Sequence, residues 1–326
     1  MPHRILTLIF FCLFLSGCAV SRLAIFPAVD GLKSVELEDT AFFPQKTSQC
    51  GPAALATLFR SSGSTVGPDE LASYLYLPGR RGSLQVEVIS ASRRFGRIPY
   101  VIDPEPSALQ AELLAGRPVL VLQNLGLRLI PVFHYAVVIG ILDDDQVVLR
   151  SGEERRLVMA GGRFAATWRR ADSWGMILLR PGELPANTAV PKRYLLEVAA
   201  IESMGRLDMA RAAYEAALTR WPDQSDALFG LANTLLAQGH SNEAAGIYRK
   251  LIEIQPRHTA AINNLAEALS RQGCFTEALI LIDETLKAVG GADAFAPALR
   301  QTRLEIKGRK PAGRQLCHPA LPPSSP

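Results

Sequence analysis

The sequence lacks the features of two large functional classes. Its 326 residues contain no basic helix, no stripe of arginine and lysine flanked by aromatic residues and no zinc-finger spacing, and the net charge is only +4. Nucleic acid is therefore not an expected partner. There is also no GxxxxGKS/T phosphate-binding loop, and the one long apolar run stands at the N-terminus. A nucleotide-driven membrane transporter is thus excluded as well.

Cysteine is scarce, with five residues in the chain. None of them forms a CxxC pair or has the spacing of metal ligands, so we expect no metal and no cofactor. Three lie beyond residue 18, namely Cys50, Cys274 and Cys317. A Cys274–Cys317 disulfide could form in an exported protein, but without a paired motif we expect separate thiols.

The N-terminus has the pattern of an export signal. An almost wholly apolar run from Ile5 to Leu15 is too short to span a bilayer and is typical of a signal-peptide core. The following Leu15-Ser16-Gly17-Cys18 resembles the bacterial lipobox. The resemblance implies that signal peptide 1–17 is removed and that Cys18 is acylated, which would hold the chain on a membrane. Ala19, where Asp would indicate retention at the inner membrane, favours the periplasmic face of the outer membrane; the alternative is an ordinary secretory signal.

The length predicts about two domains, and 48% hydrophobic residues allow a normal core. The pattern changes from mixed α/β to purely helical at Pro191, after a break rich in proline and glycine. The last segment contains five prolines and is expected to be disordered. We predict a lipidated tether with a strand leading into the fold (18–41), a mixed α/β domain (42–180), a linker (181–190), a helical domain (191–308) and a tail (309–326).

The helical domain repeats with a period of 34 residues. Small and large residues recur in register, and proline closes the first two units: Gly205, Gly239 and Gly273; Ala210, Ala244 and Ala278; Tyr214, Tyr248 and Ile282; Pro222 and Pro256. This pattern resembles the tetratricopeptide (TPR) repeat, in which glycine occupies the turn between two paired helices. We expect units over 191–224, 225–258 and 259–290, with a capping helix over 292–308.

Such an all-α solenoid presents a concave surface that binds an extended peptide or a partner helix. A protein partner on the TPR surface is therefore expected. The alternative is that the repeats only pack against the mixed α/β domain and stabilise it.

A cysteine begins one helix of the mixed α/β domain. In Cys50-Gly51-Pro52 the proline suits the first turn, and an apolar helix follows. The helix dipole and the free N–H groups at this end favour the thiolate, which is the nucleophilic form of cysteine. The other interpretation of this segment is a buried structural cysteine.

His134 is the only histidine between residues 42 and 180. It opens the predicted strand 134–142, which follows a short apolar strand at 119–122. The turn 143–146 leads into a returning strand at 147–149. A histidine in this place is a candidate base for the Cys50 nucleophile.

These features together resemble the papain-like peptidases, and among them the bacteriocin-processing enzymes that cut leader peptides. The resemblance covers about residues 42–180 and implies an α+β papain-like fold with Cys50 as nucleophile and His134 as general base. In that family a glutamine lies six positions before the cysteine and donates to the oxyanion. Gln45 lies five positions before it and is the expected donor, with Gln49 as its rival.

The third member of the catalytic site is left open by the sequence. The family usually has Asp or Asn on the strand after the histidine, whereas this strand ends in Arg150-Ser151-Gly152-Glu153. Ser151 stands at the usual distance, and Glu153 could hold a charged imidazolium. A Cys-His dyad is the third option.

A simple hairpin would set Leu142 opposite Val147, and therefore Val138 opposite Ser151 and Ala136 opposite Glu153. Both orienters would then share the face of His134, because side chains alternate along a strand.

The sequence thus favours a membrane-tethered cysteine peptidase that acts on a peptide or protein substrate recruited by TPR repeats. The absence of Asp or Asn in the third position favours a second hypothesis, in which a catalytically weak papain-like fold serves as a binding or assembly lipoprotein. A third hypothesis is a hydrolase or transferase that acts on other amides.

Overall fold

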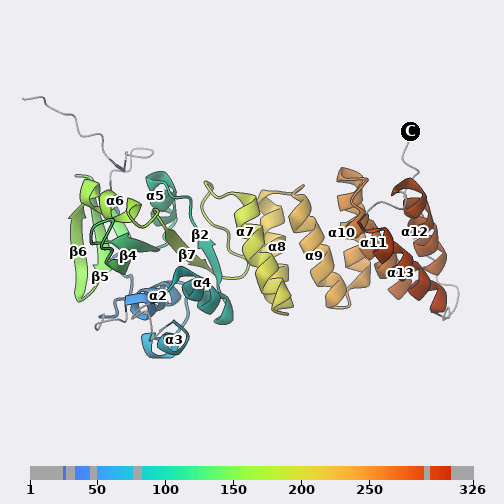
Figure 1. Ribbon diagram of the computed structural model, residues 1–326, viewed down its shortest axis with the longest axis horizontal. Coiled ribbons are helices and arrows are strands. Elements are labelled where there is room, and N and C mark those ends of the chain that lie inside the picture. The colour runs from blue at the N-terminus through green and yellow to red at the C-terminus, as the bar shows by residue number, and fades with distance from the viewer. Residues whose placement is uncertain (1–24, 27–33, 45–49, 76–82, 290–293, 310–326) are drawn as a thin grey trace, which may run out of the picture.

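The computed structural model describes residues 25–26, 34–44, 50–75, 83–289 and 294–309. Figure 1 shows an elongated molecule with a sheet-containing domain at one end and a row of paired helices at the other. The predicted signal peptide, the lipidation site Cys18, Gln45, Gln49, Cys317 and the predicted tail from residue 310 lie outside the described residues.

One antiparallel sheet forms the centre of the first domain. Its strand order is β2-β7-β3-β4-β5-β6, and β1 pairs with the far half of β4. The strands are β1 (Val35–Glu36), β2 (Ile98–Val101), β3 (Val119–Asn124), β4 (Phe133–Leu142), β5 (Gln146–Ser151), β6 (Glu154–Ala160) and β7 (Gly175–Leu179).

Helices cover both faces of this sheet (Figure 1). One face carries α2 (Cys50–Ser61), α3 (Pro68–Leu75) and α4 (Gln85–Arg94), and the other carries α5 (Pro106–Leu114) and α6 (Gly161–Arg169). Alternate residues of β4 therefore enter different cores: Tyr135 and Val137 pack in the cluster of α2, whereas Ala136 packs with α5 and α6. For this reason β4 is apolar on both faces and continuously hydrophobic from Tyr135 to its end.

The pairing of β4 with β5 differs from the simple hairpin expected from the sequence. Leu142 pairs with Gln146, one residue earlier than expected. An irregularity between Val138 and Gly140 adds a second residue, so that Val138 pairs with Leu149 and not with Ser151. Together the pairing shifts by two residues. Because side chains alternate between the two faces, a shift of two keeps Ser151 on the face of His134.

Two described parts of the segment expected to be a tether, Phe26 and residues 34–41, contribute to the fold. Phe26 is buried in the core, and its backbone N–H donates to Asp145 Oδ1 over 3.1 Å. The strand expected before residue 42 is β1, and the guanidinium of Arg150 holds the carbonyl oxygens of Glu38 and Thr40. Described residues before position 42 therefore pack with the sheet-containing domain.

The helical half follows the predicted 34-residue units. Its helices are α7 (Pro191–Ser203), α8 (Leu207–Arg220), α9 (Ser225–Ala237), α10 (Ser241–Ile254), α11 (Thr259–Arg271), α12 (Phe275–Val289) and α13 (Ala296–Gly308). Gly205, Gly239 and Gly273 have φ values of 74°, 86° and 84° in the turns within the three pairs. A side chain with a Cβ is strained there, which explains the repeated glycine.

The first repeat helix packs directly on the sheet-containing domain. Helix α7 lies against β2, and Arg93 on α4 forms an ion pair of 2.7 Å with Glu197 on α7. Tyr194 is fully buried, and its hydroxyl donates to the carbonyl of Glu183 in the predicted linker. One apolar cluster runs from the sheet through to α13. The predicted linker is thus a packed connection between the two halves.

Two further observations concern cysteine and membrane helices. Cys274 is disulfide-bonded, contrary to the expectation of separate thiols, and Cys50 is a free thiol. Among the described residues, no helix is both long and apolar enough to cross a membrane.

Two glycines within the repeats give a matched test of packing. A Cβ at Gly230 would collide with the ring of the buried Tyr214, whereas a Cβ at Gly246 meets nothing within 4 Å. We expect Gly230→Ala to lower the free energy of unfolding by about 1–3 kcal/mol. Gly246→Ala should raise it by about 0.5–1 kcal/mol, because a flexible residue leaves a helix interior. Urea denaturation of both variants measures this, and equal effects would contradict the packing described.

Candidate active site

Cys50 begins helix α2, as the sequence predicts. The thiol is half-buried, and the next nine residues of the helix are buried under the sheet. A Cβ at Gly51 would lie 2.5 Å from Ser83 Oγ, so only glycine lets the helix start approach Ser83 this closely. The same Cβ would lie 3.7 Å from the ring of Tyr135, an ordinary contact distance, which places the start of α2 beside β4.

The pKa of Tyr135 also indicates that Cys50 lies nearby. Burial raises the pKa of its hydroxyl, and negative charge on Cys50 and Glu87 raises it further. The Tyr135 ring also makes an edge contact with Trp174, with centroids 5.9 Å apart. The thiol of Cys50 thus lies within electrostatic reach of the residue that follows His134.

His134 is the second residue of β4 and is half-buried. Its Nε2 lies 2.9 Å from the hydroxyl oxygen of Ser151, the last residue of β5. Burial lowers the pKa of the imidazole, because the charged form loses solvation. The structure therefore brings together His134 and one of the two proposed orienters, and it favours the neutral ring.

Glu153, the other proposed orienter, is exposed in the turn between β5 and β6. The adjacent Gly152 has a φ of 59° in that turn. Ser151 is buried, so its hydroxyl can fix the ring while Glu153 lies in solvent. The expected oxyanion donor Gln45 and its rival Gln49 lie outside the described residues, and their role remains a prediction.

The candidate nucleophile Cys50 and the candidate base His134 lie near the same end of β4. His134 and Tyr135 are successive strand residues, so their side chains leave opposite faces. Tyr135 points toward α2, while His134 shares the face of Gln123, its partner on β3. Within the described part of the chain, no hydrogen bond joins the Cys50 thiol to His134.

Gln123 is a site residue that the sequence analysis did not single out. It is buried opposite His134, and its Nε2 donates to Thr167 Oγ1 on α6 over 2.6 Å. Together with Ser151 it lines a cavity of about 340 Å³. The signal in the sequence was the polar pair Gln123-Asn124 at the end of an apolar strand.

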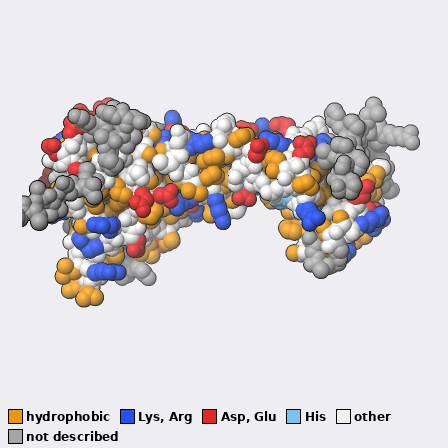
Figure 2. Space-filling model, turned by 90° about the horizontal axis from the view of Figure 1, so that it is seen from above, with side chains coloured by type: hydrophobic (Ala, Val, Ile, Leu, Met, Phe, Trp, Pro, Cys, Tyr) orange, Lys and Arg blue, Asp and Glu red, His pale blue; other side chains and the backbone are white. Residues whose placement is uncertain are grey.

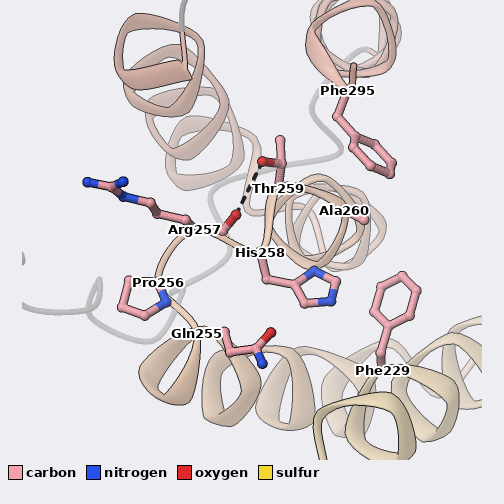
Figure 3. A pocket seen from close by; sticks show the side chains of 8 residues that line it. All are labelled: Phe229, Gln255, Pro256, Arg257, His258, Thr259, Ala260 and Phe295. Carbon is pink, nitrogen blue, oxygen red and sulfur yellow. Dashed lines mark hydrogen bonds between the residues drawn. The ribbon is translucent and has the colours of Figure 1, made fainter. Parts of the chain in front are cut away.

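A larger cavity of about 800 Å³ lies on the repeats. The rings of Phe229 and His258 face each other with centroids 4.9 Å apart, Phe295 flanks the opening, and Arg257 points away (Figure 3). His258 Nδ1 accepts the N–H of Ala261 over 3.1 Å, which holds its ring at the start of α11. The cavity therefore has preformed aromatic walls suited to an apolar side chain.

The helical half matches the family model of the tetratricopeptide repeat over residues 202–257 and 231–297. The TPR repeats predicted from the 34-residue period are confirmed for this region. No curated protein matches the chain.

Two solved structures resemble parts of the chain. The TPR2B domain of yeast Sti1, in a complex with pHsp70, is 20% identical and covers 36% of this chain and 95% of its own, with a TM-score of 0.34. The type III secretion translocator chaperone SycD of Yersinia enterocolitica is 16% identical and covers 38% of this chain and 87% of its own, with a TM-score of 0.35.

A third solved structure concerns a peptidase. The peptidase domain of Streptococcus ComA, a bifunctional ABC transporter involved in quorum sensing, is 19% identical. It covers 43% of this chain and 98% of its own, with a TM-score of 0.37.

The burial of His134 predicts how it titrates. Its pKa in the folded chain should lie below the usual value of about 6.5. Because the unfolded state then binds the proton more readily, this contribution to stability is present above pH 6.5 and is lost as the pH falls through the folded pKa. NMR titration of the imidazole in the folded and urea-unfolded chain measures both values, with His134→Gln to assign the signal. A folded pKa above the unfolded one would contradict the burial.

Proposed function

We propose that this chain is a membrane-tethered cysteine peptidase that hydrolyses a peptide bond through Cys50 and His134, with the TPR repeats recruiting its substrate or partner. The observation that carries the proposal is the 2.9 Å contact between His134 and Ser151 at the end of β4. Beneath that end, the free thiol of Cys50 begins a buried helix. The lipobox at Cys18 supports attachment to the periplasmic face of the outer membrane.

The chemistry starts from a neutral imidazole. When the Ser151 hydroxyl oxygen accepts a hydrogen bond from Nε2–H, Nδ1 carries the lone pair and can take the proton of the Cys50 thiol. The thiolate then adds to the substrate carbonyl carbon, and the oxyanion is stabilised by the backbone N–H of Cys50 and by Gln45. Collapse of this intermediate breaks the C–N bond, and His134 returns the proton to the leaving amine. Water then hydrolyses the thioester and regenerates the thiol.

The two reacting side chains must approach one another during this cycle. Catalytic hydrogen bonds in free enzymes are often long and tighten when substrate is bound. We infer that the substrate carbonyl fills the space at the end of β4 and closes the contact between Cys50 and His134.

A serine hydroxyl in the third position should limit the rate of the proposed reaction. A neutral hydroxyl orients the imidazole but stabilises an imidazolium less than a carboxylate does. Ser151→Asp should therefore increase the turnover of the enzyme, and this expectation distinguishes a working site from a decayed one.

The specific observations that favour the binding-lipoprotein hypothesis are the neutral Ser151 and the lack, among the described residues, of a hydrogen bond between Cys50 and His134. On that hypothesis the thiol has no catalytic partner, and substitution of His134 leaves its reactivity unchanged.

The reactivity of Cys50 tests the catalytic proposal directly. We expect His134→Ala to slow alkylation of Cys50 near neutral pH, because the proton acceptor is lost. Cleavage of peptides released from a periplasmic extract should fall about 10²–10⁴-fold in His134→Ala and vanish in Cys50→Ala. Peptide mass spectrometry reads both, and His240→Ala on the repeats is the matched control. Identical labelling rates in the parent, His134→Ala and Ser151→Ala chains would leave only the binding hypothesis.

The aromatic cavity tests the role of the repeats. If it holds an apolar side chain of the substrate, Phe229→Ala should raise KM for the protein substrate by about tenfold or more, because aromatic anchors dominate binding energy. The same variant should cleave a short peptide around the scissile bond at the parent rate. An equal loss for both substrates would show that the cavity does not recruit the substrate.

A further inference from the structure

The ladder between β3 and β4 continues outward as a hairpin of residues 125–133, here called the apolar hairpin. It contains six large hydrophobic residues, each of which is about half exposed to solvent or more. They are Leu125 (49% exposed), Leu127 (71%), Leu129 (94%), Ile130 (70%), Val132 (54%) and Phe133 (57%). Contiguous exposed apolar surface of this kind marks a contact with another protein or with a membrane.

The apolar side chains surround this hairpin. Backbone bonds from Leu125 N–H to Val132 O (2.8 Å) and from Leu127 N–H to Ile130 O (3.1 Å) place these four residues on one face. Phe133 alternates to the other face, and Leu129 lies at the turn. A peptide-binding groove needs one apolar face only. An element that is apolar on both faces and at its tip suits immersion in a hydrocarbon-rich medium.

Much of the backbone of the apolar hairpin is hydrogen-bonded within the protein. Asn124 is 2% exposed, and its Oδ1 accepts the N–H groups of Gly126 and Val132, each over 3.0 Å. Arg170 donates to the Asn124 carbonyl from Nε and Nη2. Unpaired backbone groups are costly in lipid, whereas water would satisfy them at no cost. The same bonds hold the hairpin in one shape before any contact is made.

Basic side chains accompany the apolar ones. Arg128 is exposed at the tip. Three more exposed arginines lie on or just after α6: Arg163, Arg169 and Arg170. The hydrogen bond from Arg170 to Asn124 places the end of α6 beside the base of the hairpin. Figure 2 shows, on this domain, a projecting hydrophobic corner beside Lys and Arg side chains. Long arginine side chains can reach phosphate groups while their stems lie in apolar surroundings, and anionic lipids attract them.

We propose that the apolar hairpin inserts into the interfacial region of an anionic phospholipid bilayer. The contact is separate from the lipid on Cys18 and does not depend on the chemistry of Cys50. Because Phe133 directly precedes His134, insertion places the candidate catalytic end of β4 at the membrane surface. A bilayer is favoured over a protein partner by the apolar side chains on both faces and at the tip of the hairpin, and by the internal pairing of the N–H groups of Leu125, Gly126, Leu127 and Val132.

The fluorescence of a tryptophan placed at the tip measures whether the hairpin inserts into the bilayer. The full chain with Leu129→Trp is reconstituted into vesicles of phosphatidylethanolamine and phosphatidylglycerol, with and without brominated acyl chains. The matched control is Leu196→Trp on α7, at a side chain that is 62% exposed. Emission is corrected for Trp168, Trp174 and Trp221 by subtracting the parent chain. Since the anchor at the N-terminus is the same in all chains, any difference reports the position of residue 129.

We expect the Leu129→Trp chain to lose most of its added emission in brominated vesicles, with a blue shift, and the Leu196→Trp chain to lose none. Adding Arg128→Glu, or replacing phosphatidylglycerol by phosphatidylcholine, should reduce the loss. Equal emission with and without bromine would overturn the proposal. If Leu129→Ser/Ile130→Ser then raised KM for a protein substrate, the hairpin would be a protein-docking surface instead, which also overturns it.

Discussion

The two-sided burial of β4 is the constraint on which the first domain depends. Successive residues of this strand enter two apolar layers, one formed with α2 and the other with α5 and α6. A one-residue slip would exchange every side chain between the layers. The same alternation sends Tyr135 toward the start of α2 and His134 toward Ser151. The packing of the core thereby decides where the candidate nucleophile and base lie.

The second organising feature is the continuity of the core across the two halves. Helix α7 belongs to the first repeat by its 34-residue register, yet it packs on β2 and its Tyr194 is fully buried. The ion pair between Arg93 and Glu197 adds to this packing, and burial raises the pKa of Glu197. The first repeat therefore serves both as part of a solenoid and as a wall of the sheet-containing domain.

Features that depend on neighbouring residues could be predicted from the sequence, whereas contacts between distant segments could not. The 34-residue period predicted the helix pairs, and Cys50-Gly51-Pro52 predicted a helix start, because both depend on neighbouring residues. The pairing of Ser151 was misjudged because two shifts, one at the turn and one next to Ile139, depend on packing that no local pattern records. Phe26 joins the core through Asp145, 119 positions away. The exposed residues 125–133 read as ordinary strand and loop in the sequence, and only their exposure in the fold sets them apart.

The packed connection at residues 181–190 has a consequence for selectivity. Its backbone is held at both sides, since Ala186 N–H donates to Glu112 and Val190 N–H donates to Tyr100. The aromatic cavity at Phe229 and the thiol of Cys50 are then separated by a fixed span, unlike sites joined by a flexible linker. On the proposed function the chain acts as a ruler: a polypeptide is cut only if its recognition element and its scissile bond are spaced to match.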